Sequence, residues 1–115
     1  MAAYAFFVPI LPGQEEADRR FMAEMVGARR AEFEASRRRH GMRTERVWQQ
    51  STPQGTFAVI YVEVDDPGQA FASIASSTDP FDVWFREQAL AVHGLDLSQP
   101  MPGPLNEQVL DWSGG

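Results

Sequence analysis

The stretch TFAVIYVEV, residues 56–64, constrains the fold of this chain most strongly. Successive side chains of a strand point to opposite faces of a sheet, so this stretch has two faces to bury. One face carries Phe57, Val59 and Tyr61, and the other carries Ala58, Ile60, Val62 and Val64. A strand that is apolar on both faces has to be covered on both faces. We therefore expect residues 56–64 to form a central strand of a sheet.

Three further strands are predicted, at 3–10, 43–51 and 108–112. Residues 3–10 carry apolar side chains on both faces, which is typical of a buried strand. The turn residues TPQG separate the strand at 43–51 from the central strand. Residues 108–112, QVLDW, follow a proline-rich connection and complete the predicted set.

Two helical segments are predicted between these strands. The first covers 15–40, with acidic residues in its first turn, arginines in its last turn and a glycine directly after it. The second begins with Asp66 as N-cap and Pro67 as first helical residue, and it ends at Gly94. The same cap signal recurs at residues 79–80, so the second segment should be broken into two helices.

The order β-α-β-β-α-β predicts an α+β domain of the ferredoxin-like type, formed by residues 1–115 as a single unit. Its four-stranded antiparallel sheet carries both helical segments on one face. The other apolar face of the sheet then has no cover within the chain. A second copy that packs sheet against sheet would cover it, so we predict a homodimer.

Composition excludes several classes of chemistry. The chain has no cysteine, which excludes disulfides, thiolate metal sites and cysteine nucleophiles and is typical of a cytoplasmic protein. The apolar run at residues 1–13 lacks a basic flank, contains two prolines and is too short to cross a bilayer. We therefore expect a cytoplasmic protein that does not bind a membrane.

Charge is distributed unevenly along the chain. The net charge is −6, and all ten basic residues are arginines. Nine of them lie between Arg19 and Arg46, whereas the second half is acidic. Such an asymmetry favours self-association or docking of an anion. A nucleic-acid reader would need a basic stripe with interleaved aromatic residues, so no nucleic-acid partner is predicted.

Five segments carry a family resemblance: SRRRHG, VWQQSTPQG, VEVDDPGQAF, STDPFDVWF and HGLDLSQPMPGPL. Through them, nearly the whole chain resembles the dimeric α/β-barrel superfamily, and more closely a family of small uncharacterised bacterial proteins. The superfamily includes cofactor-independent monooxygenases, haem-handling enzymes and many stress-related proteins. The resemblance implies a ferredoxin-like fold that pairs as a dimeric α/β barrel, and it assigns no reaction.

The resemblance also bears on cofactors. Haem-handling members depend on a proximal histidine, and the two histidines of this chain, His40 and His93, both directly precede a helix-ending glycine. The carboxylate pairs of the chain fit helix caps and do not converge as a hard-cation site requires. We therefore predict no cofactor and no metal.

Candidate site residues come first from the long helix predicted at 15–40. Arg29 and Glu32 continue its apolar face and are three residues apart, so they could form a paired, partly buried site. The alternative is that the helix overhangs the sheet, since about 39 Å of helix faces strands of about 26 Å. In that case its polar second half leaves the core, with a bend at Gly27.

Further candidates lie on the strands and the last helix. Trp48 and Gln50 share a strand face and resemble a pocket wall with an orienting amide, although Trp48 is equally well explained by packing on a dimer partner. Tyr61 is a third candidate, from the central strand. Gln88 lies within an apolar stripe and needs a hydrogen-bond partner if it is buried.

His93 is the most ambiguous candidate. It lies in the last helical turn, where a histidine interacts favourably with the helix dipole. No catalytic partner lies one turn before it, which argues against a general base. A pocket-lining role is the alternative, and a catalytic base is the third reading.

From these residues we predict that the protein binds a small molecule between helices and sheet. One form of this prediction is that the protein is a cofactor-independent enzyme. A homodimeric interaction module without a ligand is the alternative. The predicted lining is Arg29, Glu32, Trp48, Gln50, Tyr61, Gln88 and His93.

Overall fold

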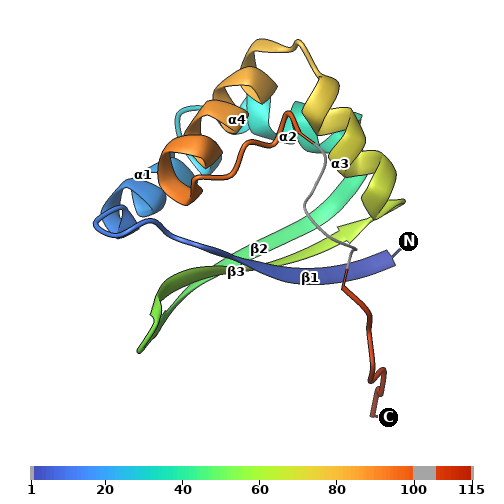
Figure 1. Cartoon of the computed structure of the whole chain (residues 1–115). Coiled ribbons are helices and arrows are strands. Elements are labelled where there is room, and N and C mark those ends of the chain that lie inside the picture. The colour runs from blue at the N-terminus through green and yellow to red at the C-terminus, as the bar shows by residue number, and fades with distance from the viewer. Residues whose placement is uncertain (1, 100–105, 115) are drawn as a thin grey trace.

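The computed structural model describes residues 2–99 and 106–114. This part of the chain forms three strands and four helices (Figure 1). In chain order they are β1 (Ala2–Pro9), α1 (Glu15–Val26), α2 (Arg30–Arg39), β2 (Met42–Thr52), β3 (Gly55–Val64), α3 (Pro67–Ser76) and α4 (Pro80–His93).

The three strands form one antiparallel sheet in the order β1-β3-β2. The central position predicted for residues 56–64 is confirmed, because β3 pairs with β1 on one side and with β2 on the other. β1 is an edge strand, where the missing N–H of Pro9 costs no ladder hydrogen bond. All four helices lie over one face of the sheet (Figure 1).

The predicted ferredoxin-like fold is wrong. Residues 108–112 form no strand, so the sheet has three strands and not four, and the dimeric α/β-barrel architecture built on four strands falls with it. Val109, Leu110 and Trp112 are 78–89% exposed, so the segment gains none of the burial that stabilises strand pairing. Just before this segment, the side chain of Asn106 donates to the carbonyl oxygen of Ala5 on the edge strand β1.

The single helix predicted at 15–40 is also wrong, because the chain breaks at Gly27 into α1 and α2. A Cβ atom at Gly27 would lie 2.8 Å from the carbonyl oxygen of Ala23, so only glycine fits here. The break changes the direction of the chain, and α2 turns Ser36 and Arg37 inward. The second half of the predicted helix therefore stays in the core and does not overhang the sheet.

The signals that start and end the last two helices are confirmed. Asp66 caps α3 by accepting from the backbone N–H of Gln69, and Asp79 caps α4 by accepting from that of Phe81. Gly94 adopts a left-handed conformation (φ 67°) and ends α4. Arg86 ties the two helices together, since it donates to two carbonyl oxygens at the end of α3.

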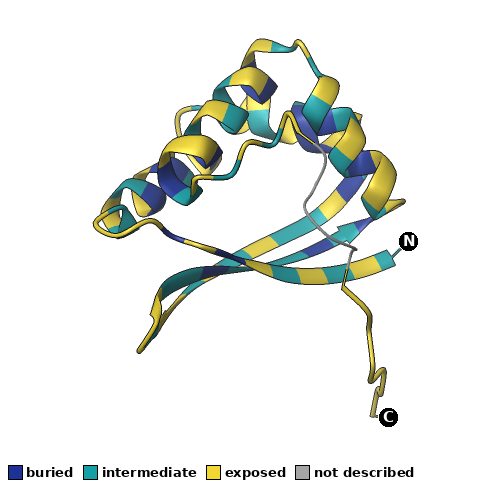
Figure 2. Ribbon diagram, viewed as in Figure 1, coloured by how far each residue is buried: buried dark blue, intermediate teal, exposed yellow. Residues whose placement is uncertain are grey.

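The core lies between the helical layer and the inner face of the sheet (Figure 2). One buried cluster joins β1 and β3 to α4 through Val8, Ala58 and Val92. A second cluster joins the helices to one another around Phe21 and Phe81. The layers do not close on each other completely, and a cavity remains between them.

Candidate functional site

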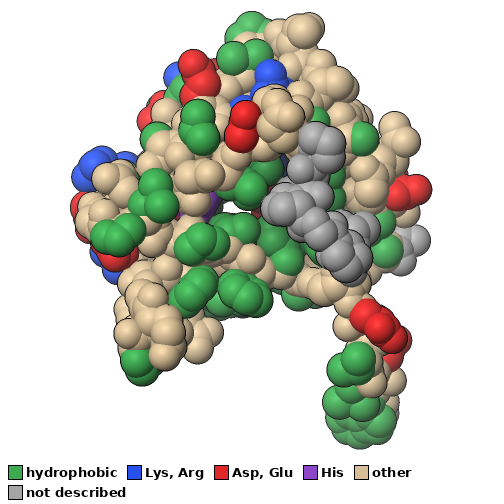
Figure 3. Space-filling view, in the orientation of Figure 1, with side chains coloured by type: hydrophobic (Ala, Val, Ile, Leu, Met, Phe, Trp, Pro, Cys, Tyr) green, Lys and Arg blue, Asp and Glu red, His purple; other side chains and the backbone are tan. Residues whose placement is uncertain are grey.

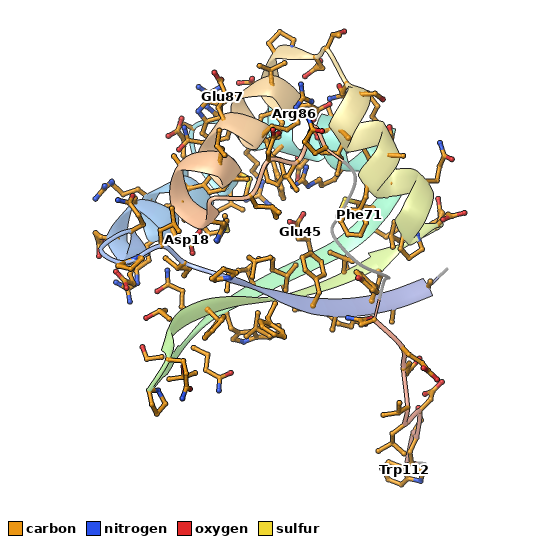
Figure 4. The ribbon with its side chains drawn as sticks, in the orientation of Figure 1. Asp18, Glu45, Phe71, Arg86, Glu87 and Trp112 are labelled. Carbon is orange, nitrogen blue, oxygen red and sulfur yellow. The ribbon has the colours of Figure 1, made fainter. Side chains whose placement is uncertain are left out.

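A cavity of about 520 Å³ lies between the helical layer and the sheet. Its floor is the inner face of the sheet, which includes Phe6, Val8, Val47, Ala58 and Ile60. Its roof comes from the four helices and from residues 95–99 after α4, and Phe71 of α3 points into it (Figure 4). The hollow is visible in the space-filling view, with a histidine side chain at its wall (Figure 3). Four charged or titratable side chains interrupt this apolar lining: Asp18, Arg37, Glu45 and His93.

Asp18 is a buried carboxylate on the inner face of α1, with 1% of its surface exposed. Its Oδ2 accepts a hydrogen bond of 3.0 Å from Nε2 of Gln49, which also donates to the backbone carbonyl of Glu15. Its Oδ1 has no hydrogen-bond partner. The first turn of α1 favours a negative charge through the helix dipole. An unpaired carboxylate oxygen is nevertheless costly when buried, so a donor is expected at this atom.

His93 faces Asp18 across the end of the cavity. Its Nδ1 lies 2.8 Å from the carbonyl oxygen of Pro9, and because a carbonyl only accepts, Nδ1 carries the hydrogen. Its Nε2 lies 3.6 Å from Oδ1 of Asp18, too far for a good hydrogen bond. The imidazole is therefore held at one nitrogen, and the other nitrogen is directed to the carboxylate oxygen that lacks a partner.

Arg37 and Glu45 form a second polar group in the cavity wall. Nε of Arg37 donates to Glu45 at 2.7 Å, and the two side chains are 7% and 15% exposed. The guanidinium also lies 4.5 Å from the ring centre of Phe85. Glu45 is four residues before Gln49 on β2, so this ion pair and the Asp18 end are about 13 Å apart along the strand. The cavity therefore has two polar ends and an apolar middle.

Behind the helical layer, Asp82 joins α2, α3 and α4. It is fully buried and accepts hydrogen bonds from Ser36, Ser77, Arg39 and His40. Burial by itself would raise the pKa of Asp82, but these donors outweigh it and hold the pKa well below its usual range. His40 also meets Ser73 through Nδ1 at 2.7 Å. None of these side chains lines the cavity, so we interpret Asp82 as a structural centre.

Three of the predicted site residues lie on the outer face of the sheet. Trp48, Gln50 and Tyr61 pair in register with Val59, Phe57 and Arg46, and strand alternation puts them opposite the cavity. Tyr61 donates to Glu63 at 2.9 Å, and this hydrogen bond raises the pKa of the phenol. Trp48 is 54% exposed.

The other four predicted residues are spread over the helical layer. Arg29 and Glu32 do approach each other, at 3.5 Å, but Arg29 binds Glu24 more closely and lies 4.2 Å above the ring of Trp84. Gln88 on α4 is half-buried and does not line the cavity. Of the seven predicted residues, His93 is the one that lines the cavity.

Sequence reasoning missed Asp18, Gln49, Arg37 and Glu45. A signal for two of them exists, since Glu45, Val47 and Gln49 alternate along β2 and form its inner face. A signal for Asp18 also exists, because Asp18, Phe21 and Met25 follow helical spacing on one stripe. The inward position of Arg37 depends on the break at Gly27, which periodicity does not reveal.

Within residues 2–99 and 106–114, no cluster of three or more carboxylate or imidazole side chains is arranged to bind a metal ion. None of the helices in this described part has the length and apolar character needed to cross a membrane. No family model, curated protein or solved structure matches the chain.

Proposed function

We propose that this protein binds a small, largely apolar organic molecule in the cavity between the helical layer and the sheet. The observation that carries the proposal is the cavity itself: about 520 Å³ of space with an apolar lining and a few polar side chains. Small-molecule sites have volumes of about 300–1,000 Å³ and this same combination of lining. Protein interiors are otherwise closely packed, so the open space between these two layers is where a ligand is expected.

The two polar ends define the shape of the occupant. One end is the ion pair of Arg37 and Glu45, which already satisfies most of its own hydrogen bonds. The other is the Asp18 end, where one oxygen lacks a donor. A molecule with a flat or elongated apolar body of up to about 13 Å and one polar group fits between them.

Titration with the neutral fluorescent dye N-phenyl-1-naphthylamine tests this proposal. We expect the dye to bind the wild-type protein with enhanced emission. Ala75 lines the cavity from α3, so Ala75→Phe fills part of the space and should weaken binding about tenfold or more, since several apolar contacts are lost. The matched control is Ala91→Phe, at an exposed position of α4. Equal dye binding by both variants would contradict the proposal.

We propose as a second function the pairing of two copies through the outer face of the sheet. Two surfaces support this pairing. Phe7 and Trp48 lie on that face on either side of Val59, and these two residues are 67% and 54% exposed. The C-terminal segment 106–114 starts beside the same face, at Ala5, and extends away from the body to Trp112 (Figures 1 and 4).

A second copy is the occupant that accounts for both surfaces together. In a twofold arrangement the segment of one copy lies along the outer sheet face of the other, and the apolar side chains of both become buried. The exposed Arg46 of that face can pair with Glu107 or Asp111 of the segment, in addition to its interaction with Glu63 on the same face. Sedimentation equilibrium at micromolar concentration should show a dimer, and a monomer would overturn the pairing.

A further inference from the structure

The Asp18 end of the cavity has an unsatisfied hydrogen-bonding pattern that specifies its ligand. Oδ1 of Asp18 is buried without a partner, while Oδ2 is occupied by Gln49. His93 is fixed at Nδ1 by Pro9 and directs Nε2 to the same place. Both side chains line the cavity, with 1% and 8% of their side-chain surface exposed. The missing element is a group that can donate to Oδ1 and also contact Nε2.

We infer that Asp18 and His93 bind the hydroxyl group of a phenol or alcohol whose apolar part occupies the cavity. This inference rests on the proposed binding function and adds the chemical class of the ligand. A hydroxyl has one donor and two acceptor lone pairs. It donates to Oδ1 of Asp18, and it accepts from Nε2 of His93 when the imidazole is protonated there. An ether, which only accepts, leaves Oδ1 without a donor.

A neutral hydroxyl fits this site better than a cationic amine. An ammonium group could also donate to Oδ1, but it has to lose its hydration to enter a site whose neighbours are Val8, Ala58 and Phe21. A hydroxyl loses less hydration and adds no charge, so the apolar surroundings favour it.

A matched pair of probes tests the inference by isothermal titration calorimetry. The compounds are 2-naphthol and 2-methoxynaphthalene, which share the apolar body and differ in the ability to donate. Hydrogen bonds to charged groups are the strong ones, so we expect 2-naphthol to bind the wild type about tenfold or more tightly than the ether. In Asp18→Asn the ratio of the two affinities should fall to about one, because the amide presents an N–H group from which both probes can accept a hydrogen bond.

Two further variants separate the hydroxyl contact from general effects. Glu16→Gln makes the same change of charge at an exposed position of α1 and should keep the full preference for 2-naphthol. His93→Asn can still donate to Pro9 from the position of Nδ1 but lacks Nε2. It should therefore weaken the binding of 2-naphthol more than the binding of the ether. Because it acts from the other side of the site, it tests the inference even if Asp18→Asn fails to fold.

The outcomes separate this inference from the binding function on which it rests. If both probes bind equally and Ala75→Phe weakens both, the cavity is a binding site but the hydroxyl contact is overturned. Tighter binding of 2-naphthylmethylammonium than of 2-naphthol would also overturn it, in favour of a cation. If neither naphthalene compound binds, the hydroxyl contact is overturned, and the dye titration then decides independently whether the cavity binds apolar molecules.

Discussion

Asp82→Asn is expected to lower the free energy of unfolding by about 3–5 kcal/mol, because it breaks a buried, charge-assisted network. Four donors converge on this carboxylate of α4: Ser36 and Arg39 of α2, His40 directly after α2, and Ser77 directly after α3. An asparagine offers one acceptor oxygen and turns an amide hydrogen towards groups that themselves donate. In a domain of this size the melting temperature should fall by at least about 10 °C. Thermal melts followed by circular dichroism measure the change.

Asp79→Asn is the control for this prediction. It makes the same substitution three residues earlier, where asparagine caps a helix as well as aspartate does, so a change below about 1 kcal/mol is expected.

The loss of stability in acid should also differ between the wild type and Asp82→Asn. The folded-state pKa of Asp82 is lowered, so its contribution is present at neutral pH and is lost as the pH falls below the unfolded value of about 3.9. Wild-type stability should therefore fall more steeply below pH 4 than that of Asp82→Asn, and parallel curves would contradict this account.

Trp48→Glu is expected to raise the dissociation constant of the proposed dimer by about 100-fold or more, or roughly 2.7 kcal/mol. Trp48 lies at the centre of the outer sheet face, next to Val59 and in the same row as Phe7. In a symmetric dimer the substitution places a carboxylate from each copy in an apolar interface, where it loses hydration without gaining a partner. Sedimentation velocity over a dilution series measures the shift.

Leu90→Glu provides the matched comparison. Leu90 is 52% exposed, similar to Trp48, but it lies on α4 rather than on the outer sheet face. We expect Leu90→Glu to sediment in the same way as the wild type. If both variants dissociate to the same extent, or if neither does, the outer face is not the interface.

Much of the local structure could be predicted from the sequence because it depends on local chemistry. The caps at Asp66 and Asp79 and the stop at Gly94 each act within one helical turn, and each was placed correctly. The centre of the sheet was also predictable, since β3 is apolar on both faces. The fourth strand was not, because QVLDW has strand-forming residues but finds no partner edge that buries them. Strand pairing is a long-range outcome that propensity alone does not decide.

The candidate site was predictable only in part, for a similar reason. Alternation along β2 correctly separates Trp48 and Gln50 from Glu45 and Gln49, but it does not say which set faces the helices. Aromatic character favoured the set with Trp48, and the cavity is lined by the other set. The helix that carries His93 supplies no partner for it one turn earlier, and Asp18 comes from α1, distant in sequence.

The most direct test of the central claim is to locate the bound dye by its effect on methyl signals in solution. The protein is labelled at isoleucine and valine methyl groups, and spectra are recorded as N-phenyl-1-naphthylamine is added. Val47, Ile60 and Ile74 line the cavity, whereas Val59 lies on the opposite face of the sheet. We predict that the three cavity signals shift together and saturate while the signal of Val59 stays in place. Shifts at Val59 without shifts in the cavity would contradict the claim that this protein binds its ligand between helices and sheet.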